Sequence, residues 1–152
     1  MTTTLKQRLK DDLTAAIKGR DELRSATIRL TLSAITNEEV AGKTARQLSD
    51  DEVQKVIARE AKKRREAAEA FAQGGRAESA ERERAEGVVL AEYLPTQLTD
   101  EELTQLVRSA IAESGAEGPR AMGAVMKVVN PKVAGLAEGG RVAAEVKRQL
   151  AG

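Results

Sequence analysis

The sequence predicts an all-α protein of about seven helices, arranged as an N-terminal helical domain and a small C-terminal domain of three helices. Three observations lead to this prediction. The 152 residues include one Phe, one Tyr and no Trp, so the core must consist of aliphatic and small side chains, which favours closely packed helices over a sheet. Only three prolines interrupt the chain. Apolar residues recur at helical spacing between start and stop signals.

Two helices are predicted at the N-terminus. The threonines at positions 2–4 can cap the first helix, and Gly19 is expected to end it in the left-handed conformation. Asp21 can cap the second helix, which is expected to run to about Ala41. The apolar stripes are Leu5, Leu9, Leu13, Ala16 and Ile17 in the first helix and Leu23, Ala26, Thr27, Leu30, Ala34 and Ile35 in the second.

The third and fourth helices are predicted to form an antiparallel hairpin. Ser49 and Glu52 make a capping box at the start of the third helix, which is expected to span about residues 50–73 before a Gly-Gly turn. The fourth helix is expected from about 77 to 93. Its first half, residues 78–86, is mostly charged and is expected to be solvated. The second half is expected to be buried through Val88, Val89, Ala91 and Leu94.

A run of four basic residues, 62–65, falls in the middle of the third helix and has two interpretations. Phosphate binding is one, but a helix turns about 100° per residue, so four consecutive side chains point all round it. Arg64 falls on the apolar side between Ala61 and Ala68, where its stem can pack and its head can pair with an acid. Nearby acids at i,i+4-like spacing favour this structural interpretation.

The segment 92–103 holds a helix stop followed at once by a helix start. Pro95 lacks a backbone N–H and moves Leu94 away from helical dihedrals, so the fourth helix must end near here. Thr99 with Glu102 forms a second capping box and begins the fifth helix. We therefore predict an N-terminal domain at 1–94, a linker at 95–98 and a tail domain at 99–152, with Tyr93, Leu94 and Pro95 as the interdomain joint.

The predicted tail domain consists of three short helices. The fifth helix of the chain has the cleanest amphipathic pattern and is expected to end at Gly115. The sixth is expected to begin at Pro119 and to be closed by Pro131, and the last follows a glycine-rich loop. Gly123 is costly inside the sixth helix, which suggests that another backbone approaches closely there, through packing or through bound RNA.

The missing residue types restrict the chemistry of the protein. With no Cys and no His, disulfides, thiolate catalysis and the commonest general base and metal ligand are excluded. No apolar run approaches the ~18 residues of a membrane span, and the N-terminal residues lack the apolar stretch of a signal peptide. Two of the acidic clusters directly follow helix caps, where acids are stabilising in any case. We therefore expect a cytoplasmic protein with no cofactor, no metal and no membrane contact.

The net charge is only +1, but its distribution is uneven. Residues 99–117 hold five acids and one base, whereas residues 118–152 hold six bases and two acids. The glycine-rich approach to the last helix adds backbone amides that suit an anion. No aromatic side chain is present there to stack on bases, so recognition of a folded RNA by its shape is favoured over single-strand binding. The candidate phosphate-binding residues are Lys127, Lys132, Arg141, Lys147 and Arg148.

Three segments stand in an order and spacing that resemble a known family. They are Ser49-Asp50-Asp51-Glu52-Val53 leading to Arg59-Glu60-Ala61-Lys62-Lys63-Arg64-Arg65-Glu66, then Glu92-Tyr93-Leu94-Pro95-Thr96-Gln97-Leu98, and finally Met122-Gly123-Ala124-Val125-Met126 with Pro131-Lys132-Val133. Over essentially its full length the chain resembles the YqeY family, stand-alone proteins that share a C-terminal domain with the B subunit of the aspartyl/glutamyl-tRNA amidotransferase. One departure is Gly140, where a lysine is expected after the first glycine, and Arg141 can replace that charge.

The resemblance implies a helical N-terminal domain and a three-helix tail domain, which in the amidotransferase is associated with holding the tRNA. It also implies the family label of a carbon–nitrogen ligase with glutamine as amido-N-donor, although the phosphorylating domain and the glutaminase subunit of that enzyme have no counterpart in this sequence. Our first hypothesis is a non-catalytic protein associated with tRNA or with a tRNA amidation complex. The alternative is a helical protein–protein adaptor without RNA binding, which predicts an exposed apolar patch near Met122 and Met126. A true amidotransferase is the third, and the missing Cys and His argue against it.

Overall fold

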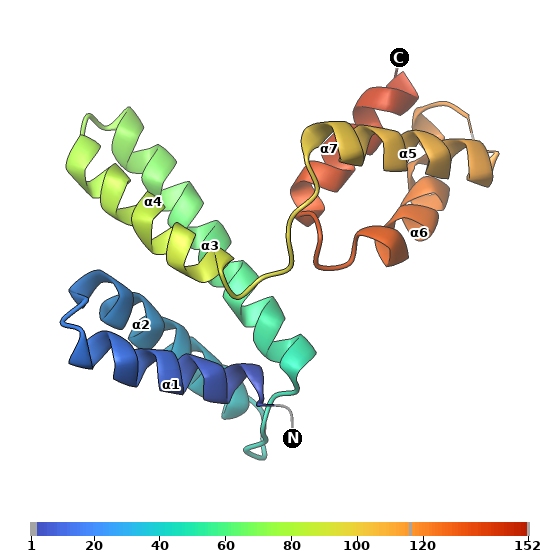
Figure 1. Cartoon of the computed structure of the whole chain (residues 1–152). Coiled ribbons are helices and arrows are strands. Elements are labelled where there is room, and N and C mark those ends of the chain that lie inside the picture. Colours follow the sequence, from blue (N-terminus) through green and yellow to red (C-terminus); the bar gives the residue numbers. More distant parts are fainter. Residues whose placement is uncertain (1–2, 116, 152) are drawn as a thin grey trace. The chain divides into compact units, whose positions relative to one another are not determined.

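The computed structural model describes residues 3–115 and 117–151, and the regular secondary structure of this part of the chain is all helical, as predicted (Figure 1). The described residues form seven α-helices and one 3-10 turn, and none of them lies in a strand. The chain divides into two compact units. We call the part up to Leu94 the head unit and the part from Pro95 onward the tail unit. Among the described helices, none is long and apolar enough to cross a membrane.

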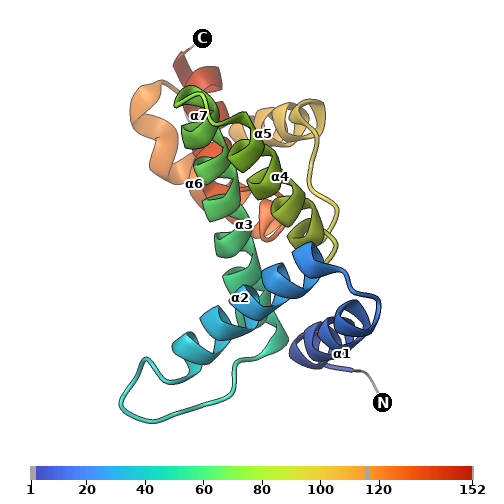
Figure 2. The same cartoon turned by 90° about the vertical axis from the view of Figure 1, so that its left-hand side faces the viewer.

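The head unit contains α1 (Leu5–Lys18), α2 (Glu22–Glu39), α3 (Asp50–Gln73) and α4 (Ala77–Ala91). The predicted hairpin of α3 and α4 is present, and α1 pairs with α2 (Figure 1 and Figure 2). The first three helices begin at the side-chain caps Thr4, Asp21 and Ser49, each of which accepts a hydrogen bond from an amide of the first turn. The capping box of Ser49 with Glu52 is confirmed, so local sequence determines where these helices start.

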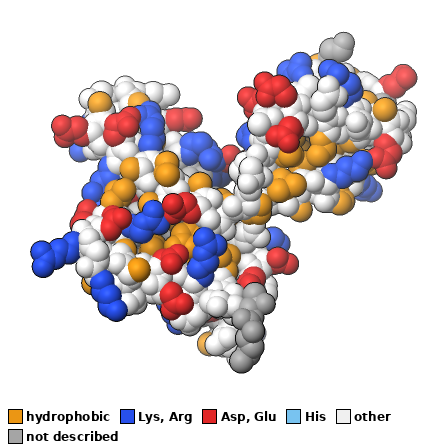
Figure 3. All heavy atoms as spheres, in the orientation of Figure 1, with side chains coloured by type: hydrophobic (Ala, Val, Ile, Leu, Met, Phe, Trp, Pro, Cys, Tyr) orange, Lys and Arg blue, Asp and Glu red, His pale blue; other side chains and the backbone are white. Residues whose placement is uncertain are grey.

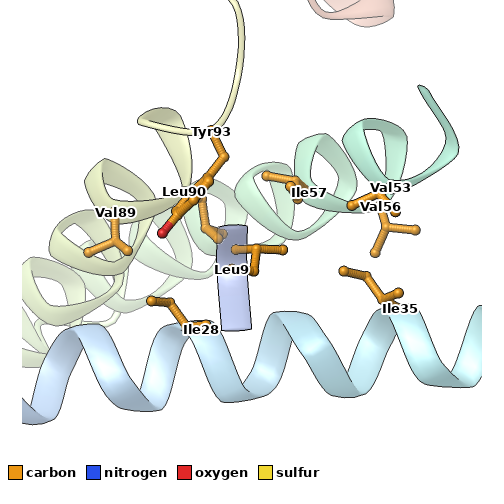
Figure 4. Packing of buried hydrophobic residues seen from close by; sticks show 9 residues of the cluster. All are labelled: Leu9, Ile28, Ile35, Val53, Val56, Ile57, Val89, Leu90 and Tyr93. Atoms are coloured by element: carbon orange, nitrogen blue, oxygen red, sulfur yellow. The ribbon is translucent and has the colours of Figure 1, made fainter. Parts of the chain in front are cut away.

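One cluster of buried side chains holds the head unit together (Figure 4). All four helices contribute to it, and Tyr93 comes from the turn that follows α4. Most of its members are aliphatic, as the composition predicts, and burying each of them contributes roughly 1.5–3 kcal/mol. Tyr93 is the one aromatic ring of the cluster. The members are Leu9, Ile28, Ile35, Val53, Val56, Ile57, Val89, Leu90 and Tyr93.

The buried face of α4 differs from the prediction in its second half. Val89 is buried and Leu94 is half-buried, as expected, but Val88 is 66% exposed and Ala91 is also exposed. Leu90, which we did not assign to the buried face, is fully buried. The prediction for Val88 and Ala91 was wrong because consecutive apolar residues leave the orientation of a helix open until its neighbours are in place.

The charged first half of α4 packs against α3 and is not solvated throughout, contrary to the prediction. Glu86 is buried there, and Arg64 of α3 pairs with Glu60, Glu83 and Glu86 at 3.4, 3.5 and 3.7 Å. The prediction that Arg64 pairs with acids from the apolar side is therefore confirmed. The two preceding lysines of the basic run also pair with acids of their own helix, which supports the structural interpretation of the run.

The end of α1 also differs from the prediction, because Arg20 and not Gly19 adopts the left-handed conformation. Gly19 has a φ of −81°, whereas Arg20 has a φ of 56°. The amide of Arg20 donates to the carbonyl of Ile17 at 3.1 Å, and the amide of Asp21 donates to the carbonyl of Ala16 at 2.9 Å. These two bonds are those of a Schellman motif, and they place the left-handed residue one position later than the glycine suggested.

The tail unit contains α5 (Asp100–Ser114), the 3-10 turn η1 (Pro119–Ala121), α6 (Met122–Val133) and α7 (Gly139–Ala151). The capping box of Thr99 with Glu102 is confirmed, and Gly115 ends α5 in the left-handed conformation. Pro131 does not close α6, which continues to Val133 because that side chain is buried in the core. The core consists of Leu103, Val107, Ala110, Val125, Val129, Val133, Val142 and Val146.

Candidate nucleic-acid interface

The five candidate phosphate-binding residues all lie on the second and third helices of the tail unit. Lys127 and Lys132 belong to α6, and Arg141, Lys147 and Arg148 belong to α7. Arg141 is half-buried and the other four side chains are exposed. Local sequence explains this placement, because the buried valines of each helix recur every four residues and leave the intervening positions facing outward.

Two of the four exposed cations already have an acidic partner on the surface. The ammonium of Lys132 lies 2.6 Å from the carboxylate of Glu113 on α5. Arg148 lies 2.7 Å from Glu145 on its own helix, and its guanidinium holds the pKa of the Glu145 carboxyl below its usual value, with a further hydrogen bond from Gln149. Exposed pairs of this kind are worth about 0–1 kcal/mol, so a phosphate group can displace the acid at modest cost.

Arg141 differs from the other four candidates, because its side chain contacts residues at the start of the tail unit. Its guanidinium donates to the carbonyl of Leu98 at 3.0 Å and pairs with the carboxylate of Asp100 at 3.0 Å. Moving Arg141 onto a phosphate would break both contacts. The structure therefore gives Arg141 an internal role that the sequence pattern did not reveal.

Lys127 and Lys147 have no acidic partner among the described residues. Lys127 lies about 200° around α6 from the buried Val125, so it points away from the core. Gly123, one turn earlier, shares this outer face, and a Cβ atom added to it would meet nothing within 4 Å. Close packing against the described residues is therefore not the reason for glycine at this position. Of the two alternatives that the sequence left open for Gly123, packing is wrong and contact with RNA stays a prediction.

Gly139 and Gly140 begin α7, and added Cβ atoms would likewise meet nothing within 4 Å. The first amides of any helix lack intrahelical acceptors, so the open approach leaves them accessible. These glycines lie on the same helix as Lys147, and Gly123 lies on the same helix as Lys127, so each of the two candidate cations without an acidic partner among the described residues shares its helix with exposed glycine backbone.

Met122 and Met126 are half-buried and pack against the core of the tail unit. They are neither sealed in the interior nor fully exposed, so the apolar patch that the adaptor hypothesis requires is present only in part. Figure 3 shows apolar side chains reaching the surface of the tail unit on the visible face, and acidic and basic side chains interspersed over the head unit.

Tyr93, at the predicted joint, belongs to the head unit core. Its hydroxyl donates to Asp12 of α1, and the guanidinium of Arg8 lies 4.6 Å from the ring centroid. Burial and the bond to Asp12 raise the pKa of Tyr93 far above its ordinary value. A phenol held in the neutral form in this way is a poor nucleophile or base, so the contacts of Tyr93 indicate packing. Leu94 is half-buried beside it and Pro95 begins the tail unit.

The described residues contain no cluster of three or more acidic side chains arranged to hold a metal ion.

The sequence analysis did not assign a role to Gln97, whose side-chain amide donates to the carbonyls of Pro95 and Gly135 at 2.9 Å each. Gln97 lies in the Tyr-Leu-Pro-x-Gln-Leu string, which was the available signal, but the acceptor on the loop before α7 is known only from the fold.

A sequence model of the YqeY family, described as Yqey-like protein, matches residues 6–150. The match covers both units and nearly the whole chain, and it confirms the resemblance that was read from the three segments. No curated protein matches the chain.

Proposed function

The chain belongs to the YqeY family, and on this premise we propose that it is a non-catalytic protein whose tail unit contacts tRNA or a complex that amidates tRNA-bound amino acids. The observation that carries this proposal is the pair Lys127 and Lys147. Both are exposed cations without an acidic partner among the described residues, in a segment where bases exceed acids.

The chemistry of the tail unit favours a structured RNA over a single strand. Its residues include no aromatic side chain, so stacking on bases, which gives single-strand binders much of their affinity, is absent. Lysines and open backbone amides bind phosphates without reading sequence, and a folded RNA is recognised by the positions of its phosphates and 2′-hydroxyls. The resemblance of the tail to the tRNA-holding domain of the amidotransferase selects tRNA among such RNAs.

A salt series with the full chain and total tRNA tests this proposal. Binding should weaken steeply with salt, because each phosphate contact releases condensed counterions. The variant K127A/K147A should lower the slope of log K against log salt by about 1.4–1.8, since each lost contact accounts for roughly 0.7–0.9. The matched control K18A/K55A removes the same charge from exposed lysines of the head unit and should leave the slope unchanged.

Equal effects of the two variants would show that only the total charge matters and would overturn the assignment of the site. A chain that does not bind tRNA at low salt would contradict direct contact with tRNA and leave only contact with the amidating complex. Arg141 is unsuitable as the first variant, because its loss also removes the contacts with Leu98 and Asp100.

The half-buried Met122 and Met126 favour a second candidate, a protein–protein adaptor that docks through the tail unit. Flexible thioether side chains suit such surfaces. This function predicts no RNA binding and a complex in cells that survives high salt, because apolar contacts are not screened. The variant M122Q/M126Q should release the partner while K127A/K147A retains it, and release by the lysine variant alone would contradict the adaptor function.

A further inference from the structure

The string Glu92-Tyr93-Leu94-Pro95-Thr96-Gln97-Leu98 has contacts on both of its sides, and the two sets belong to different units. Its first three residues are fastened to the head unit. The hydroxyl of Tyr93 donates to Asp12, and Arg8 covers the Tyr93 ring and donates to the carbonyl of Glu92 at 3.3 Å. Leu94 packs against the head unit core.

A second helix of the head unit holds the same end. Arg24 of α2 lies 2.6 Å from the carboxylate of Glu92, and its hydrogen bond lowers the pKa of the Glu92 carboxyl. Both α1 and α2 therefore restrain the backbone at residues 92–94. Since neither helix is adjacent to this segment in sequence, the restraint exists only when the head unit is folded.

The last two residues of the string are fastened to the tail unit. The amide of Leu98 donates to the carbonyl of Leu136 at 2.7 Å, and the side chain of Gln97 donates to the carbonyl of Gly135 at 2.9 Å. Arg141 completes the fastening through the carbonyl of Leu98 and the carboxylate of Asp100. The loop between α6 and α7 and the first turn of α7 thus restrain the backbone from Gln97 onward.

Between the two fastened ends lie only Pro95 and Thr96. Thr96 is exposed and takes part in no hydrogen bond among the described residues, and the Pro95 carbonyl is bonded only by the neighbouring Gln97 side chain. We propose that Pro95 and Thr96 form a two-residue hinge between the head and tail units, with Gln97 and Arg141 as positioning residues that set where the hinge ends. This inference does not depend on RNA binding.

The composition of the hinge limits its motion. The ring of Pro95 fixes its φ near −65°, and the Gln97 side chain holds its carbonyl through one exposed hydrogen bond. Rotation is therefore left chiefly to the ψ angle of Pro95 and, when that single bond opens, to the two backbone angles of Thr96. A hinge of this length permits reorientation of one unit with little change in the separation of its attachment points. Releasing Gln97 and Arg141 would lengthen the free segment and relax this restriction.

Amide hydrogen exchange of the full chain tests the limits of the hinge. The Leu98 amide should exchange at least about 100-fold more slowly than its unstructured rate, whereas the Thr96 amide should exchange within about tenfold of it. In Q97A/R141A the protection of Leu98 should fall at least about tenfold, while the core amide of Val107 stays protected. The matched variant R148A removes an arginine of the same helix whose partner is Glu145, and it should leave Leu98 unchanged.

Distances between spin labels test the motion itself, and the absence of native Cys makes labelling straightforward. Labels at N37C and N130C, on exposed positions of the two units, should give a broader distance distribution than labels at S109C and N130C within the tail unit. T96P should narrow the first distribution, and Q97A/R141A should widen it. A protected Thr96 amide, or a distribution between units as narrow as that within the tail unit, would overturn the hinge.

Discussion

Replacing Arg64 by alanine should destabilise the head unit more than any other change in the basic run. The Arg64 side chain is 18% exposed and is shared by three acids, of which Glu60 and Glu86 are almost fully buried. Removing one partner of a buried ionic cluster costs about 3–5 kcal/mol, because the remaining charges are left in a medium that solvates them poorly.

Two features of the structure reduce that figure for R64A. Glu60 keeps Lys63 at 3.1 Å and Glu86 keeps Arg82 at 3.2 Å, although both of these cations are about half exposed. The contacts of Arg64 itself, at 3.4–3.7 Å, are longer than a strong charge-assisted hydrogen bond. We therefore expect a loss of about 2–3 kcal/mol, at or below the lower limit of the range for buried pairs.

Lys62 is the matched control for Arg64. It belongs to the same run on α3, carries the same charge and forms one exposed pair with Glu66 at 3.9 Å. K62A should cost less than about 0.5 kcal/mol. The variant R64M/E86M should recover part of the loss of R64A, because it removes a cation and a buried acid together and leaves apolar groups in their place.

Urea unfolding followed by far-ultraviolet circular dichroism measures these differences. Amide exchange at Leu90 reports on the head unit alone, because this residue is fully buried in the head unit core. A free energy of unfolding for R64A within 0.5 kcal/mol of K62A would refute the reasoning, since the cluster would then behave as a set of surface pairs.

Four further outcomes are expected. T99A removes the cap of α5, where the Thr99 hydroxyl accepts from the Glu102 amide, and should lower the stability of the tail unit by about 1 kcal/mol in urea unfolding; a loss as large for the exposed T96A would contradict the capping role. R20G relieves a side chain held at positive φ and should raise the stability of the head unit by about 0.5–1 kcal/mol in the same assay, whereas a decrease would show that Arg20 makes stabilising contacts. The Arg46 guanidinium and the Ser49 amide lower the pKa of Glu52 to about 2. The stabilising contribution of the Glu52 carboxylate is therefore present above the unfolded pKa of about 4.3 and is lost as pH falls toward 2. E52Q should flatten the pH dependence of stability in this window, and an unchanged profile would contradict the pairing of Glu52 with Arg46. The pure chain should not hydrolyse glutamine, and measurable release of ammonia would restore the amidotransferase hypothesis.

Local sequence was sufficient wherever a few neighbouring residues determine the structure. The two capping boxes lie within four residues each, and both helix starts were predicted from them. The end of α1 shows how far such reasoning reaches. Glycine is the residue that tolerates the left-handed conformation most readily, yet the Schellman bonds formed one residue later and placed Arg20 there.

The candidate interface shows the same division. The sequence located five basic residues in the tail and separated them from an acidic helix. It did not reveal that Arg141 contacts Leu98 and Asp100, because those contacts join residues about 40 positions apart. It also did not reveal that Lys127 and Lys147 have no acidic partner in the described part of the chain, because that depends on which helix faces which. The sequence also did not reveal the open space beside Gly123. The cost of glycine in a helix suggested a close contact there, but the surroundings of Gly123 depend on how the helices of the tail unit pack.

The sequence by itself determined that the chain is all-α, where most of its helices begin, and to which family it belongs, because caps, turn residues and apolar periodicity act over a few residues and are written in order along the chain. Tertiary structure alone decided that acids in the charged half of α4 pair with Arg64 and that Val88 faces outward. It also decided which contacts hold the residues before and after Pro95. Each of these depends on free energy gained between helices distant in sequence, and an amphipathic pattern specifies that a face is buried without specifying what buries it.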